Sequence, residues 1–279
     1  MAFRDTCVCI SSLETDFGLL NQAAQIAEAW QAHLACCAVT VQPAPVYSDG
    51  LISGQSDFAL LWQAAEESNE AFRQGLALHL QDTSSAAELR EVRAYEVGMA
   101  EAVSVFARYA DVLIARMPDH QDRKRHGEII EGGLFGAGRP VLALPEQWKP
   151  SVLGQNVLFA WDASREASRA IHDALPMLAE NAKVCVVTVD ARVGPKQHGA
   201  SPGLDIATHL ARHGLKVSVR NEDSLGKPVG ERLVEIAKGL GADMIVMGGY
   251  RHPKIAQRLV EGPSQFLISK SPLPVFLSH

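Results

Sequence analysis

Short apolar runs alternate with segments of helical periodicity along the whole chain. The apolar runs lie at residues 7–12, 34–41, 89–97, 110–116, 139–145, 157–160, 184–189, 215–219, 244–247 and 272–277. Between them, apolar residues recur every three to four positions, as on one face of a helix, and residues 57–80 form the longest such segment. Runs that are apolar on both faces are typical of parallel strands covered by helices on both sides. The pattern therefore predicts an α/β fold.

The order of these elements in residues 1–148 recurs in residues 152–279. Three short sequence matches support a duplication: Val39-Thr40-Val41 with Val187-Thr188-Val189, Ala110-Asp111 with Ala242-Asp243, and Pro140-Val141-Leu142 with Pro274-Val275-Phe276. The spacing between matching segments shortens after the first match, which places an insertion around residues 57–80. We predict two doubly wound, five-stranded parallel-sheet domains, 1–148 and 152–279, joined by a linker at residues 148–150.

The segment from 242 to 264 has the strongest local pattern for a binding site. An apolar run ends at Gly248-Gly249, and Pro253 follows at a position suited to the first residue of a helix. Glycines at a strand end permit positive φ and close approach of a ligand, and the next helix offers free N–H groups. Many such turns bind nothing. In doubly wound folds ligands lie at the carboxyl ends of strands, so Asp162 and Val189 are further candidates.

Composition narrows the class of partner. The 279 residues are 47% hydrophobic and carry a net charge of −6, with 26 basic residues scattered along the chain, so nonspecific nucleic-acid binding is disfavoured. No apolar run is long enough to span a membrane, and the first residues lack the pattern of a signal peptide. The five cysteines lie on or beside apolar runs, as expected for core residues in a reducing compartment. We expect a cytoplasmic protein.

The sequence gives little indication of catalytic, metal-binding or redox-active residues. The chain has no Gly-x-Ser-x-Gly nucleophile elbow and no Gly-x4-Gly-Lys-Ser/Thr phosphate loop. His209 and His213 lie four residues apart on a predicted helix, but no third ligand is evident, so a solvated face is favoured over a metal site. A thiol redox site is a weaker alternative to core packing for the cysteines. We predict no catalytic residue and no metal ligand.

Residues 157–164 and 243–264 resemble the universal stress protein family in its tandem two-domain form. The resemblance implies an adenine nucleotide alpha hydrolase-like fold. Many members bind ATP through an aspartate after the first strand, a residue at the end of the second strand, and a Gly-x2-Gly-x9-Gly-Ser/Thr motif. Carried onto this sequence, the site residues are Asp162, Val189, Gly248, Gly249, Arg251, Gly262 and Ser264.

Three residues depart from the family motif. Arg251 replaces the second glycine, which closes the backbone approach but offers a cation suited to phosphate. Glu261 stands where the third glycine is expected and would repel a triphosphate, and Pro263 lacks an N–H group. ATP is therefore one expectation beside a smaller nucleotide, another anion or an empty site. Mg²⁺ is expected only together with ATP.

The first half departs further from the motif. Its first strand is followed by Ser11-Ser12-Leu13 rather than an aspartate, the nearest acid being Glu14, and its fourth strand ends at Arg116 without a glycine loop. We expect this half to support its partner rather than to bind nucleotide.

In family dimers the last strand often pairs across the domain interface, which implies that residues 141–144 and 275–277 meet as edge strands of an internal pseudo-dimer. Homodimerisation beyond this is left open. The resemblance favours a noncatalytic, nucleotide-binding stress-response protein. The alternatives are a ligand-free interaction module and a slow ATPase.

Overall fold

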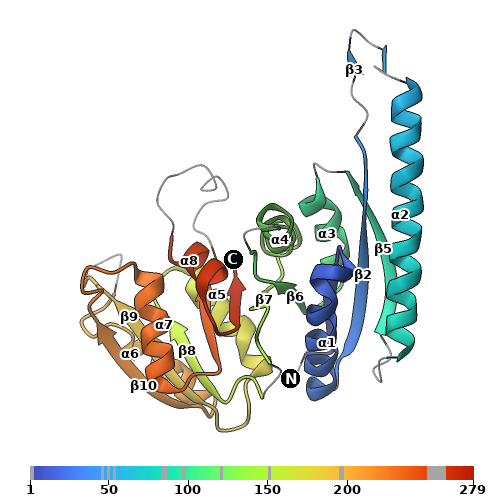
Figure 1. Ribbon diagram of the computed structural model, residues 1–279. Coiled ribbons are helices and arrows are strands. Elements are labelled where there is room, and N and C mark those ends of the chain that lie inside the picture. The colour runs from blue at the N-terminus through green and yellow to red at the C-terminus, as the bar shows by residue number, and fades with distance from the viewer. Residues whose placement is uncertain are drawn as a thin grey trace.

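The computed structural model describes residues 3–44, 47–48, 51–52, 55–82, 87–95, 98–119, 122–149, 152–194, 198–249 and 262–279. Its main feature is one ten-stranded sheet (Figure 1). The first half supplies β1 (Asp5–Ile10), β2 (His33–Gln42), β5 (Ala87–Tyr95), β6 (Val112–Arg116) and β7 (Val141–Leu144). The second half supplies β8 (Asn156–Ala160), β9 (Lys183–Val189), β10 (Lys216–Glu222), β11 (Met244–Gly248) and β12 (Val275–Ser278). A separate two-stranded sheet pairs β3 (Tyr47–Ser48) with β4 (Leu51–Ile52).

The strand order is the same in both halves. Across the sheet it runs β10-β9-β8-β11-β12-β7-β6-β1-β2-β5, so the third strand of each half lies at an outer edge and the fifth at the centre. Within the ten-stranded sheet, all pairings inside each half are parallel. This confirms the predicted α/β fold of two doubly wound halves. The domain boundary stays a prediction, since residues 150 and 151 lie outside the described residues.

The two halves meet through their last strands. β7 and β12 pair antiparallel, with Phe276 opposite Leu142 and Leu277 opposite Val141. These four side chains are fully buried. The predicted meeting of residues 141–144 with 275–277 is confirmed. Because the strands of each half are parallel to one another, this antiparallel junction places the carboxyl ends of the two halves at opposite edges of the sheet.

Helices cover both faces of the sheet and divide the core into two layers. Residues of α3 (Met99–Ala107), α4 (Arg123–Glu131), α7 (Val229–Leu240) and α8 (Pro263–Lys270) pack in one layer. Residues of α1 (Leu13–Trp30), α2 (Gln55–Asp82), α5 (Arg165–Ala174) and α6 (Leu204–Arg212) pack in the other. Two short helical segments, η1 (Gly132–Ala137) and η2 (Leu175–Met177), follow α4 and α5. No described helix combines the length and the hydropathy needed to cross a bilayer.

The repeated Ala-Asp pair ties each half together at the start of its first strand. Asp111 accepts hydrogen bonds from the backbone N–H groups of Arg4 (2.8 Å) and Asp5 (3.1 Å). Asp243 accepts equivalent bonds from Gly154, Gln155 and Asn156 at 2.8–3.0 Å. The insertion predicted around residues 57–80 corresponds to α2, which has 28 residues against nine in α6. The aspartates of the repeated Ala-Asp pair thus support the backbone at the start of each half.

The facing pair Leu142 and Phe276 provides a test of the central junction. We expect each change to alanine to lower the free energy of unfolding by about 2–5 kcal/mol, because it leaves a cavity in the core. The double variant should lose at least about 0.5 kcal/mol less than the sum, because the two side chains are direct neighbours. Urea unfolding of the four proteins measures this coupling.

The control cycle combines Phe276→Ala with Leu76→Ala on α2. Leu76 is also fully buried, but α2 packs on β2, three strands away from β7. We expect these two losses to add. Additivity of the Leu142 and Phe276 losses as well would contradict the observed register.

Candidate functional site

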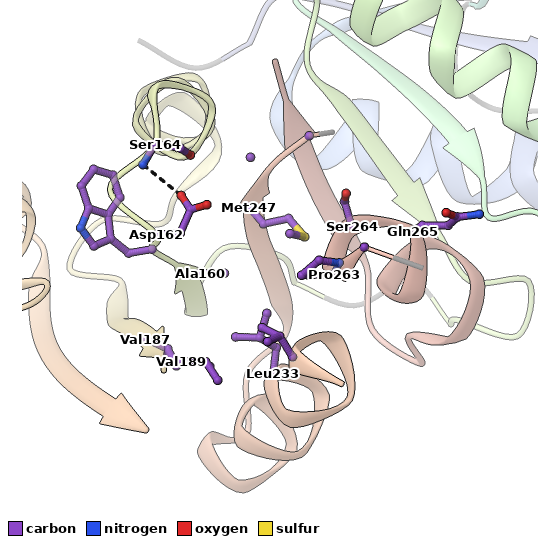
Figure 2. Close-up of a pocket in the computed structure, with 15 residues that line it drawn as sticks. Ala160, Asp162, Ser164, Val187, Val189, Leu233, Met247, Pro263, Ser264 and Gln265 are labelled. Carbon is purple, nitrogen blue, oxygen red and sulfur yellow. Dashed lines mark hydrogen bonds between the residues drawn. The ribbon is translucent and has the colours of Figure 1, made fainter. Parts of the chain in front are cut away.

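A pocket of about 390 Å³ lies at the carboxyl edge of the second half. Its walls come from the ends of β8, β9 and β11 and from the N-terminal ends of α7 and α8 (Figure 2). The described residues that line it are Ala160, Trp161, Asp162, Ser164, Val187, Val189, Val229, Leu233, Met247, Gly248, Gly249, Gly262, Pro263, Ser264 and Gln265. This is the place where a doubly wound sheet offers a ligand site.

The structure brings six of the seven predicted site residues to this pocket. They are Asp162, Val189, Gly248, Gly249, Gly262 and Ser264. The seventh, Arg251, lies outside the described residues, as do Pro253 and Glu261. Their predicted effects on the site stay predictions.

One side of the pocket is apolar. Val187, Val189 and Leu233 lie on one side of the cavity in Figure 2, and Met247 lies on β11 between them and α8. Such a slot suits a flat apolar body such as a heterocyclic base. The sequence identified only Val189, because Leu233 and Met247 belong to a helical pattern and a buried strand that have packing functions anyway.

The opposite side carries the polar groups. Asp162 is exposed and accepts a hydrogen bond from the Ser164 N–H (3.0 Å) (Figure 2). Ser164 is the N-cap of α5, and its hydroxyl accepts from the Ala167 N–H (3.0 Å). The cap is therefore Ser164, and Asp162 supports the turn before it. Between them Ala163 has φ of 58°, a left-handed conformation that is costly for alanine.

The N-terminus of α8 contributes the positive end of a helix dipole. Gly262 is its N-cap, and Pro263 occupies the first helical position. Proline removes one donor there, yet the N–H groups of Ser264 and Gln265 belong to the first turn, where no intrahelical partner exists. An anion at this end of the pocket would be stabilised by both effects.

The glycines act differently from the sequence-based prediction. Neither Gly248 nor Gly249 has a positive φ. A Cβ at Gly248 would lie 2.6 Å from the Ala167 nitrogen and 2.7 Å from the Glu166 carbonyl carbon. The absence of a side chain at Gly248 therefore lets β11 pack against the backbone of α5. Glycine is required at this position because α5 and β11 approach each other closely.

Arg116 marks the contrast with the first half. It ends β6 as Gly248 ends β11, and its side chain is buried. The guanidinium donates to the Thr15 carbonyl and pairs with Asp119 (2.7 Å) and Glu146 (3.0 Å). An extended cation thus fills the strand end that glycine leaves open in the second half.

A buried hydrogen-bonded pair of side chains crosses the same edge of the first half. Asp16 on α1 lies 2.9 Å from His126 Nε2 on α4, and both side chains are almost fully buried. Asp16 also accepts from the backbone N–H groups of Ser11 (2.8 Å) and Ser12 (3.2 Å). Burial by itself raises the pKa of Asp16, but the hydrogen bonds from His126 and Ser11 hold this pKa below its usual value. This network supports the expectation that the first half does not bind nucleotide.

The cysteines have the burial expected of core residues. All five are buried, and burial raises the pKa of Cys36 to about 12. A thiol with such a pKa is rarely ionised at neutral pH and is a poor nucleophile. The core interpretation is favoured over a redox site.

Comparison with known proteins agrees with this architecture. Residues 154–279 match the model of the universal stress protein family. The second half of the chain therefore carries a universal stress protein domain. No curated protein matches the chain significantly.

Solved structures extend the similarity to the whole fold. A universal stress protein from Archaeoglobus fulgidus DSM 4304 matches 98% of this chain and 96% of its own, with 16% identity and a TM-score of 0.71. A functionally unknown protein from Pseudomonas aeruginosa PAO1 matches 99% of this chain and 92% of its own, with 14% identity and a TM-score of 0.55. At these identities the similarity shows that both halves of the chain share the fold of known structures.

The buried Asp16 carboxylate gives a pH-dependent prediction. Asp16→Asn should lower the free energy of unfolding by about 3 kcal/mol at pH 7, because it leaves His126 without its charged partner. Since the pKa of Asp16 is lowered on folding, the carboxylate stabilises the fold above the unfolded value of 3.8, and this is lost as pH falls further. Urea unfolding at pH 7 and pH 3 should show the difference shrinking.

Glu28→Gln, an exposed change on the same helix, is the control for Asp16→Asn. It should alter stability by less than about 0.5 kcal/mol at either pH. An Asp16→Asn penalty that is equal at pH 7 and pH 3 would contradict the assignment.

Gly248 and Gly262 form a matched pair at the pocket. Gly248→Ala should cost about 1–3 kcal/mol, because its Cβ must displace the α5 backbone. A Cβ at Gly262 would meet no atom of the described residues within 4 Å, and its φ of −68° suits alanine. Gly262→Ala should therefore cost less than about 1 kcal/mol. Thermal unfolding compares them, and equal losses would reject the packing explanation for Gly248.

Proposed function

We propose that the second half of this universal stress protein binds an adenine nucleotide, with ATP as the expected ligand, and acts without catalysis. The supporting observation is the pocket that combines an exposed carboxylate, an apolar slot and a helix N-terminus. Its volume of about 390 Å³ lies within the range of small-molecule sites. The apolar slot would take the base, and Asp162 would accept hydrogen bonds from amino or hydroxyl groups of the nucleoside.

The phosphates would lie toward α8. The first-turn N–H groups of Ser264 and Gln265 and the helix dipole favour negative charge at this end. Pro263 gives fewer donors than a helix start without proline. Mg²⁺ would enter with the triphosphate, since the described lining residues offer a single carboxylate, that of Asp162.

The lining residues support binding without turnover. Among the described residues of the pocket, Asp162 is the only ionisable side chain. Catalysis of phosphoryl transfer needs groups that orient a nucleophile and stabilise developing charge. A stress-response function then follows from ligand occupancy, which would change a partner surface or the packing of the two halves.

Calorimetric titration of the full chain with Mg²⁺ and ATP tests the proposal. Asp162→Ala should weaken ATP binding about tenfold or more, because it removes a hydrogen bond to a charged group. Asp190→Asn is the control, since Asp190 follows Val189 directly but binds the Ser224 N–H (2.9 Å) outside the pocket. The affinity of the Asp190→Asn variant for ATP should stay within about twofold of the wild-type affinity.

The same samples discriminate the alternatives. Absence of binding at millimolar ATP would reject the proposal and favour a ligand-free interaction module. Time-dependent release of ADP and phosphate, lost in Asp162→Ala, would reject the noncatalytic part and indicate an ATPase.

A further inference from the structure

Three histidines gather on the surface of the second half, away from the residues that line the pocket. His172 lies on α5, His209 lies on α6, and His213 follows the end of α6. The rings of His172 and His209 have centroids 5.1 Å apart, and those of His209 and His213 are 4.8 Å apart. The sequence shows only the His209 and His213 spacing, because α5 and α6 become neighbours through the crossover between β8, β9 and β10.

The orientation of His172 is set by a second contact. Its Nδ1 lies 2.7 Å from the Ser168 carbonyl oxygen, and its Nε2 lies 3.1 Å from His209 Nε2. A carbonyl oxygen can only accept a hydrogen bond, so His172 Nδ1 carries the proton and its Nε2 presents a lone pair toward His209. Histidines that bind metals usually donate their other ring N–H to a carbonyl or carboxylate in this way.

The separation of the two Nε2 atoms matches the bite of a metal chelate. With metal–nitrogen bonds of about 2.05 Å, two ligands are about 2.9 Å apart at a right angle and about 3.3 Å apart at a tetrahedral angle. The observed 3.1 Å lies between these values. A metal ion could therefore replace the hydrogen bond between the rings with little movement of either helix.

We propose that His172 and His209 chelate a divalent transition-metal ion, with Zn²⁺ as the probe, between α5 and α6. Imidazole nitrogen is a preferred ligand for Zn²⁺, and the remaining positions would be taken by water. No group of three or more His, Cys, Asp or Glu in the described chain has the geometry of a metal cage, so His213 stays outside the site.

Binding of the ion requires a lone pair on the Nε2 atom of each ring. His209 would move its proton from Nε2 to Nδ1 when the ion binds, so the exchange leaves the charge of both rings unchanged.

Calorimetric titration with Zn²⁺ tests the site on the full chain without a histidine affinity tag. Wild type should bind one equivalent that raises the unfolding temperature, since the ion links two helices of the folded state. His172→Ala and His209→Ala should each weaken this binding at least about tenfold, because each removes one of two protein ligands. All three rings lie at the surface, so these variants should unfold like wild type without Zn²⁺.

Two control variants distinguish this site from its rivals. His213→Ala tests the chelate within α6 that the sequence spacing suggests, and His33→Ala tests a histidine that lies near Asp5 and Glu88. Both should keep the Zn²⁺ affinity within about threefold. The proposal is overturned if wild type shows no Zn²⁺ binding at about 1 mM Zn²⁺, a concentration at which even a weak chelate would be occupied. It is also overturned if His172→Ala binds like wild type, whichever control loses affinity.

Discussion

The antiparallel pairing of β7 with β12 determines the arrangement of everything else. Each half is a parallel sheet whose fifth strand has an open edge, and an open edge exposes unpaired backbone groups. Pairing Phe276 with Leu142 closes both edges at once and buries the strands on both faces. The same junction directs the carboxyl edges of the two halves in opposite directions, so the pocket of the second half lies at the edge opposite to the carboxyl edge of the first half.

The carboxyl edges of the two halves differ in what occupies the end of the fourth strand. In the second half Gly248 has no side chain, so α5 contacts β11 and leaves space beyond the strand end for a pocket. In the first half Arg116 fills the strand end, and Asp16 with His126 joins α1 to α4 across it. In the first half the buried carboxylate of Asp16 and the buried guanidinium of Arg116 both have hydrogen-bonding partners, whereas the pocket keeps Asp162 exposed to solvent.

The fold was predictable because its signals are local. Apolar runs, helical periodicity and the repeated Ala-Asp pair are all visible within short windows, and the strand-end rule located Asp162 and Val189 at the pocket. The family resemblance added Ser264. The resemblance supplied the meeting of the two last strands. The positive φ expected at Gly248 was wrong, and its packing against α5 was missed because sequence does not show which backbone approaches a glycine.

The interactions that the sequence missed join residues far apart in the chain. Asp16 and His126 are separated by 110 residues, and His172 and His209 by 37. The first pair joins helices from opposite faces of the sheet and the second joins neighbouring helices on one face, and periodicity specifies neither arrangement. Leu233 and Met247 were missed for another reason, since a pocket wall and a core position have the same apolar signature.

The pseudo-dimer also differs from a true dimer in how it responds to dilution and to mutation. Its two halves are covalently joined, so their association is an intramolecular event that does not weaken at low concentration. In a symmetric homodimer every substitution appears on both sides of the interface. Here each side can change alone, as shown by Phe135 in the first half, whose ring packs edge-on against His279 at the end of the second (4.7 Å between centroids). One half can thus lose a binding site while the other keeps it.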